Sequence, residues 1–155
     1  RHVFGETDAQ VERKVAAAIG EGLAPLVCVG ETLDERREGR VEEVIVRQLD
    51  AALLGVPEGV KKLVLVAYEP VWAIGTGETA SPEQAQEMHA FIRNLIAENY
   101  NQELADGISI LYGGSVNPSN TASFMNYSEI NGVLVGSASL KDKDFIEIAK
   151  IASQS

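Results

Sequence analysis

Glu69 is placed where a carboxylate could do acid–base chemistry. It follows the apolar run 63–67 and directly precedes Pro70. A carboxylate in this position is either solvated where a strand ends or held in place as a general base. The residue types alone leave both readings open.

Glycines beside small hydroxyl residues follow other apolar runs. The three groups are Gly75-Thr76-Gly77, Gly113-Gly114-Ser115 and Gly136-Ser137. Glycine lets backbone N–H groups approach a ligand closely, and consecutive amides can form a nest for an anion. Each group alone is also typical of a tight turn. Together, they predict a phosphate site that uses backbone amides instead of basic side chains.

Strands and helices must alternate to position these residues. Continuous apolar runs predict parallel strands buried on both faces at 24–29, 63–67, 108–112 and 132–135. Helical periodicity covers 11–19, 41–52, 85–96 and 145–151, and a short helix is expected to start near Asn117. Capping boxes begin at Thr7, Thr32 and Ser81.

Parallel strands joined by helical crossovers place their carboxyl ends, and therefore the working residues, at one edge of the sheet. The predicted strands recur about every 36 residues, comparable to the roughly 31 of an eight-unit barrel. The pattern alone allows either an open doubly wound sheet or part of a barrel. Both are α/β folds.

Composition narrows the possible partners. The chain has 155 residues and a formal net charge of −10, which disfavours nucleic acid and anionic membrane surfaces. No apolar run approaches the roughly 18 residues that span a bilayer, and no targeting segment is recognised. A single cysteine, Cys28, excludes an internal disulfide and fits a reducing compartment. The sequence opens on Arg1 instead of Met, which is consistent with a missing upstream segment.

Four segments resemble the triosephosphate isomerase family in motif, order and spacing. They are CVGE at 28–31, EPVWAIGTG at 69–77, YGGSV at 112–116 and LVGSASL at 134–140. The resemblance covers the whole chain. It implies a TIM barrel of eight strands, of which residues 1–155 would form a single C-terminal half with four parallel strands and outer helices.

The resemblance also implies an activity. Family members interconvert dihydroxyacetone phosphate and glyceraldehyde 3-phosphate through an enediolate, without cofactor or metal. Glu69 matches the general base of that reaction. A carboxylate suits this role because it can take a proton from one carbon and return it to the next.

Other positions match substrate and lid residues of the family. The substrate phosphate would be held by Gly75, Ser115, Gly136 and Ser137. The mobile lid would contain Pro70, Val71, Trp72, Ala73, Ile74, Thr76 and Gly77. Tyr112 and Ser115 match lid-latching residues, and Glu31 would support Trp72 in the open lid. Lid closure would exclude water and protect the enediolate from losing its phosphate.

The sequence departs from the family pattern in two ways. Ser137 stands where a second glycine is usual, so its side chain must point away from the phosphate. The family's first four strands have no counterpart here. The catalytic His and the active-site Asn and Lys, which those strands carry in the family, are therefore missing as well. His2 and His89 are expected to have surface or packing roles instead, and Cys28 to be a small core residue. The charged stretch 34–40 is expected to form a solvated face.

A half-barrel would leave two open sheet edges and an uncovered inner face. We therefore expect self-association or pairing with an N-terminal half-barrel, and weak or no isomerase activity of the chain alone. The family places the protein in the cytoplasm, in glycolysis and gluconeogenesis, as a homodimer. The alternative is a non-catalytic, phosphate-binding and self-associating module, or an engineered fragment.

Overall fold

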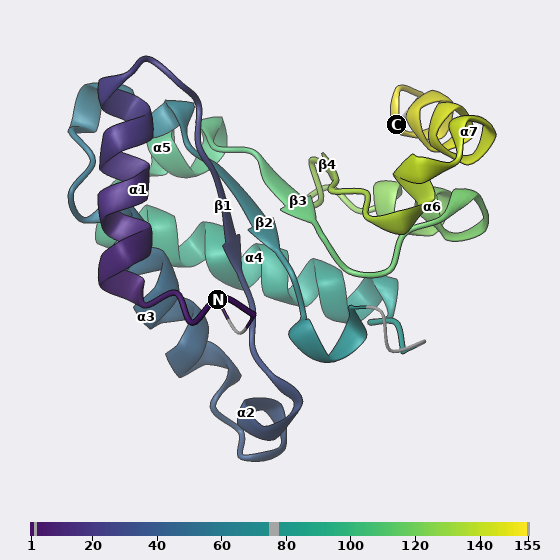
Figure 1. Ribbon diagram of the computed structural model, residues 1–155, viewed down its shortest axis with the longest axis horizontal. Coiled ribbons are helices and arrows are strands. Elements are labelled where there is room, and N and C mark those ends of the chain that lie inside the picture. Colours follow the sequence, from purple (N-terminus) through teal and green to yellow (C-terminus); the bar gives the residue numbers. More distant parts are fainter. Residues whose placement is uncertain (2, 75–77, 155) are drawn as a thin grey trace.

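The computed structural model describes residues 1, 3–74 and 78–154. Its centre is a four-stranded parallel sheet in the order β1-β2-β3-β4 (Figure 1). The strands are β1 (Leu26–Val29), β2 (Leu65–Tyr68), β3 (Ile110–Tyr112) and β4 (Gly132–Val133). The α-helices are α1 (Asp8–Gly20), α2 (Leu33–Arg37), α3 (Val41–Leu53), α4 (Pro82–Asn99), α5 (Gln102–Gly107), α6 (Pro118–Met125) and α7 (Asp142–Ala152). Three 3₁₀ turns complete the order: η1 (Glu58–Leu63), η2 (Val71–Ala73) and η3 (Ser137–Leu140).

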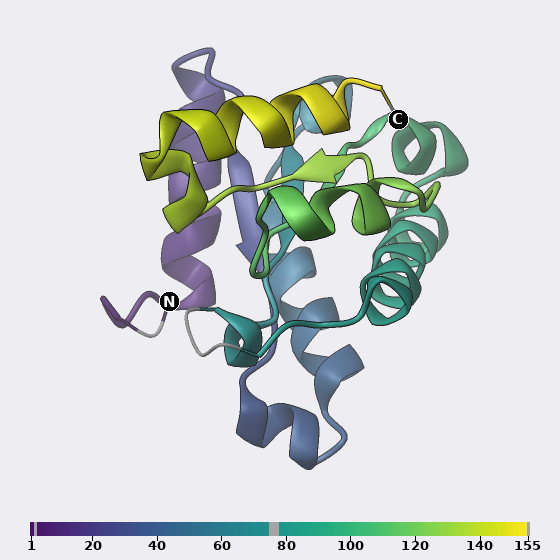
Figure 2. The ribbon, with the colours of Figure 1, turned by 90° about the vertical axis from the view of Figure 1, so that its right-hand side faces the viewer.

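The strand order decides between the two predicted architectures. Each strand pairs with the next one along the chain, from Val66↔Ile110 to Tyr112↔Val133. A doubly wound sheet reverses its strand order at a switch point, whereas barrel strands follow the chain order. The helices α1 and α3 lie beside β1, and α6 and α7 lie beside β4 (Figures 1 and 2). The α/β fold is thus a four-strand parallel unit of the TIM-barrel kind.

The local signals account for most of the helix starts. Complete capping boxes are present at Thr7, Thr32, Ser81 and Asn117. The helix after Thr32 is short, because Gly39 with φ +71° separates it from α3. The structure adds η1 and α5, which the sequence analysis did not predict, and shortens the fourth strand from 132–135 to Gly132–Val133.

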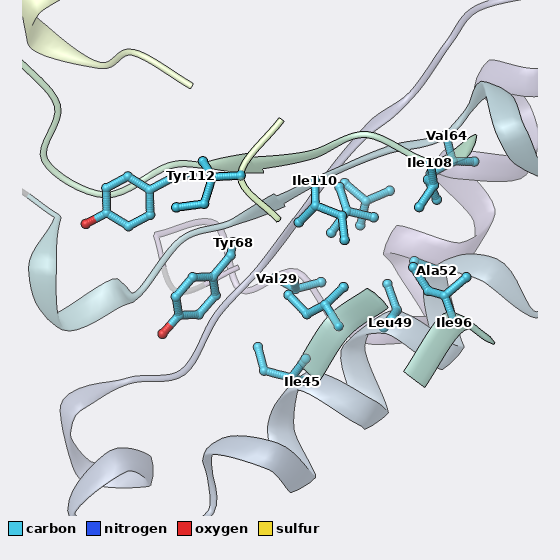
Figure 3. Packing of buried hydrophobic residues seen from close by; sticks show 14 of the residues in the cluster. Val29, Ile45, Leu49, Ala52, Val64, Tyr68, Ile96, Ile108, Ile110 and Tyr112 are labelled. Atoms are coloured by element: carbon cyan, nitrogen blue, oxygen red, sulfur yellow. The ribbon is translucent and has the colours of Figure 1, made fainter. Parts of the chain in front are cut away.

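The core lies between one face of the sheet and the helices. Strand side chains such as Val29 and Ile110 meet Ile45 and Leu49 of α3 and Ile96 of α4 (Figure 3). All five are at most 2% exposed. The buried faces of α3 and α4 therefore pack against the strands through one continuous apolar layer.

The prediction that every strand is buried on both faces was wrong for β4, whose two residues are both half-buried, and for β1. Val27 and Val29 are buried, but Leu26 and Cys28 alternate with them and are exposed. The physical reason is that helices cover only one face of this strand. Cys28 is accordingly not the core residue we expected. Among the described residues, no helix has the length and hydropathy needed to cross a bilayer.

Candidate active site

The chemistry-bearing residues meet at the carboxyl edge of the sheet. Beyond the strands, the ladder continues as the Gly113 N–H donates to the Tyr68 carbonyl and the Leu134 N–H to the Tyr112 carbonyl, both at 2.8 Å. This keeps the three strand exits in line. They border a pocket of about 360 Å³ that is lined by Glu69, Ile74, Gly113, Gly114, Ser115, Gly136 and Ser137, among others.

Glu69 extends over the exit of the neighbouring strand. A Cβ atom placed on Gly113 would lie 2.5 Å from Glu69 Cγ, closer than real side chains approach one another. Only glycine at position 113 therefore leaves room for this carboxylate. The sequence analysis assigned Gly113 to a predicted phosphate site, and the structure shows that this glycine also leaves the space that Glu69 occupies.

Desolvation raises the pKa of Glu69 above its usual range. A hydrogen bond from the Cys28 thiol opposes part of this shift. A general base works best when its pKa approaches the working pH. Burial thus shifts the pKa of Glu69 toward the working pH, which is the shift that a general base needs.

Three of the residues that line this pocket have backbone amides without a protein partner. Within the described part of the chain, the N–H groups of Ser115, Gly136 and Ser137 donate to no acceptor. None of the described lining residues is Lys, Arg or His. The pocket can therefore bind an anion through backbone dipoles, as amide nests do.

Glu31 is a fully buried carboxylate with three partners. It accepts hydrogen bonds from Trp72 Nε1 at 2.7 Å, from Tyr68 Oη at 3.1 Å, and from Arg36 Nη1 at 3.2 Å. The Arg36 guanidinium also lies 4.7 Å from the centre of the Trp72 ring. These contacts satisfy a buried charge that would otherwise be costly. Burial and the Glu31 charge together raise the pKa of Tyr68.

The predicted lid segment is described up to Ile74. Val71–Ala73 form η2, with Pro70 and Ala73 buried, and the Val71 N–H donates to the Glu31 carbonyl at 3.0 Å. Ile74 is 45% exposed and borders the pocket. The predicted positions Gly75, Thr76 and Gly77 lie outside the described residues.

Tyr112 is fully buried, and its ring stacks on the Phe124 ring with the two ring centres 4.2 Å apart. Its hydroxyl has no hydrogen-bond partner of normal geometry within the described residues. Burial raises the pKa of Tyr112 to about 12, and the nearby Ala80 backbone opposes part of that shift. Ser115 lines the pocket, and its carbonyl accepts a hydrogen bond from Asn120 at 3.0 Å.

Two residues of the site had no clear signal in the sequence. Arg36 lies in the stretch 34–40 that we expected to be wholly solvated, yet it pairs with the buried Glu31. Gln48 was read only as part of a helix face, but it is buried and bonds to Gly30. Their spacing from Glu31 and Gly30 depends on how α2 and α3 fold back, so no local pattern identifies them.

The histidine predictions can be followed for one residue. His89 is fully buried on α4, packs edge-to-face against Tyr68, and places Nδ1 3.2 Å from the Glu129 carbonyl. This is the packing position expected of it. His2 lies outside the described residues. Among the residues that the structure describes, no group of three or more His, Cys, Asp and Glu side chains is arranged to hold a metal ion.

Comparisons with known proteins identify the family of this chain. A family model described as triosephosphate isomerase matches residues 1–152. Proteins named triosephosphate isomerase from Delftia acidovorans and Chlorobaculum tepidum are 53% and 51% identical to this chain over 152 residues each. The alignments cover 98% of this chain but only 60% and 61% of those relatives.

A third relative of the same name, from Protochlamydia amoebophila, is 47% identical over 148 residues, or 96% of this chain and 56% of its own length. The chain thus spans about 60% of the length of the relatives it matches. The family match over residues 1–152 and the identity to these relatives show that the chain belongs to the triosephosphate isomerase family.

Proposed function

We propose that this chain carries the base and the phosphate site of a triosephosphate isomerase. One observation supports this most: the Glu69 carboxylate shares a pocket with three partnerless backbone amides, at Ser115, Gly136 and Ser137. The reaction interconverts dihydroxyacetone phosphate and glyceraldehyde 3-phosphate. It requires a base within reach of the substrate carbons and an anchor for the phosphate.

In the proposed mechanism, the amides hold the phosphate together with Gly75. Glu69 takes a proton from the carbon beside the carbonyl, and the electron pair moves to form an enediolate. The protonated Glu69 then returns the proton to the adjacent carbon, while the hydroxyl proton of the enediolate moves from the oxygen of one carbon to the oxygen of the other, which leaves the carbonyl group on the first carbon. The lid, Pro70 to Ala80, closes over the intermediate, with Tyr112 and Ser115 as its latch. Glu31 holds Trp72 when the lid is open.

An enediolate also needs a group that stabilises its developing oxyanion. No histidine, lysine or arginine is among the described residues that line the pocket, and His89 is buried in the core. We propose that residues 1–155 act as one C-terminal half-barrel that lacks this electrophile. The chain alone would be weak or inactive, because one such donor is worth roughly 2.7–4 kcal/mol of transition-state stabilisation.

Self-association or pairing with an N-terminal half would complete the sheet. β1 and β4 are the two edge strands, and Leu26 and Cys28 leave the uncovered face of β1 exposed. Family dimer contacts come mainly from the half absent here, so a homodimer of this chain would use another surface. We place the assembly in the cytoplasm, at the triose-phosphate step of glycolysis and gluconeogenesis.

A coupled isomerase assay tests the enzymatic proposal. We expect little turnover by the chain alone and a rise when an N-terminal half-barrel is added. Glu69→Gln should abolish that rise, whereas Glu87→Gln, at an exposed position on α4, should leave it unchanged. Near-normal turnover by the isolated chain, or full activity of Glu69→Gln, would contradict the proposal.

The second candidate is a non-catalytic phosphate-binding module, which the free amides favour because they need no electrophile. It predicts phosphate or sulfate binding that Glu69→Gln does not weaken, with no turnover in any assembly. Light scattering tests the association common to both candidates. A compact monomer that persists at micromolar concentration would rule out self-association.

A further inference from the structure

Gln48 on α3 is a buried polar side chain that the mechanism above does not use. It is 3% exposed. Its Oε1 accepts the Gly30 N–H at 2.8 Å, and its Nε2 donates to the Gly30 carbonyl at 3.2 Å. One side-chain amide therefore satisfies both backbone groups of a residue 18 positions away.

The direction of these bonds follows from the parallel ladder. The carbonyls on either side of Gly30, at Val29 and Glu31, accept the N–H groups of Glu69 at 2.7 Å and Val71 at 3.0 Å. Because backbone groups alternate in direction along a strand, the Gly30 amide and carbonyl face away from β2. Gln48 takes the place of a neighbouring strand at this point.

Gly30 also lies directly against the backbone of the base. A Cβ atom on Gly30 would come within 1.7 Å of the Glu69 carbonyl oxygen. The segment 29–31 thus contacts Glu69 by packing as well as by hydrogen bonding. Any shift of Gly30 must move Glu69 and the start of the lid, because no space separates them.

We propose that Gln48 is a positioning residue that holds Glu69 and Trp72 in register through residues 29–31. The link to Glu69 runs through Gly30 and the Val29 carbonyl. The link to Trp72 runs through the backbone of Glu31, whose side chain accepts the indole N–H. The inference rests on the proposed role of Glu69 as the base.

Gln48→Met tests the proposal, because it keeps the side-chain length and removes both hydrogen bonds. Trp72 is the only tryptophan of the chain, so its fluorescence reports on the Glu31 contact. We expect a red shift of Trp72 emission and, by carboxyl NMR, a Glu69 pKa that falls toward its usual range as water enters. Leu49→Ala, at a 2% exposed neighbour on the same helix, controls for general destabilisation.

Gln48→Glu supplies an independent test. A protonated carboxyl group can both donate and accept, as the amide does, whereas the carboxylate cannot donate to the Gly30 carbonyl. Buried glutamates can titrate as high as about pH 8–9. We therefore expect native Trp72 emission at low pH and a reversible red shift as the pH rises, absent from the unmodified chain.

Neither measurement uses turnover, so their outcome is separate from that of the coupled assay. The proposal fails if Gln48→Met leaves both signals unchanged, or if Leu49→Ala moves them equally. If Gln48→Met does not fold, the pH titration of Gln48→Glu decides. The absence of a pH-dependent step there overturns the positioning role.

Discussion

Acidification should destabilise this fold through His89. Burial lowers the pKa of His89 to about 4, and the nearby positive charge of Arg93 adds to the effect. The hydrogen bond to the Glu129 carbonyl opposes it. That carbonyl accepts the Nδ1 proton of the neutral ring, while Nε2 has no partner within the described residues. Protonation would therefore place an unpaired charge in the core.

The magnitude follows from the two pKa values. The unfolded chain binds a proton near pH 6.5 and the folded chain near pH 4, so unfolding is favoured as the pH falls between them. At pH 5 the linkage amounts to about 2 kcal/mol, and below pH 4 it approaches about 3.4 kcal/mol. The contribution of the neutral His89 ring to the free energy of unfolding is therefore complete above pH 6.5, the pKa in the unfolded chain, and it is lost as the pH falls toward 4.

Urea unfolding followed by circular dichroism at pH 8, 7, 6 and 5 measures this loss. His89→Gln keeps a polar side chain of similar size but cannot titrate, so its stability should fall by about 2 kcal/mol less over that range. Carboxylates titrate in both proteins and cancel in the difference. Parallel pH dependences for the two proteins would refute the reasoning.

Three further predictions concern the site. Trp72→Phe removes one donor from the buried Glu31 and should cost about 1–3 kcal/mol in urea unfolding; an unchanged midpoint would contradict the contact. Although Cys28 is exposed as a residue, the atoms packed around its thiol desolvate it; this desolvation, and then Glu69, raises its pKa to about 12. Cys28 should therefore react with a disulfide reagent roughly 50-fold more slowly than an ordinary cysteine. Equal rates would show that its thiolate is not suppressed. Gly113→Ala should displace the Glu69 side chain and lower turnover of the assembly with an N-terminal half by about 100-fold, while phosphate binding persists. Unchanged turnover would mean that the carboxylate does not need this space.

The helices were predictable because their signals are local. The capping boxes at Thr7, Thr32 and Ser81 each lie within four residues, and all three start helices. The β4 strand was overestimated, because apolar character continues to Val135 although the pairing with β3 ends at Val133. α5 was missed because its six residues span too few turns for a periodic pattern.

The site was predictable only as a set of positions. The motifs around Glu69, Ser115 and Gly136 pointed to one sheet edge, and the structure brings these residues to one pocket. Their catalytic and binding roles stay predictions. The partners of Glu31 were only partly foreseen: Trp72 was expected, but Tyr68 and Arg36 were not.

By itself, the sequence determined the order of the four strands and of the long helices, the helix starts that carry capping boxes, and the family, because these depend on neighbouring residues and on motif order. Only the tertiary structure decided which side of β1 stays uncovered, that Cys28 lies beside Glu69, and that Gln48 satisfies Gly30. Those features arise when segments distant along the chain pack together. Burial and hydrogen-bond partners are properties of that packing, and an apolar run reads the same whether one face of its strand is covered or both.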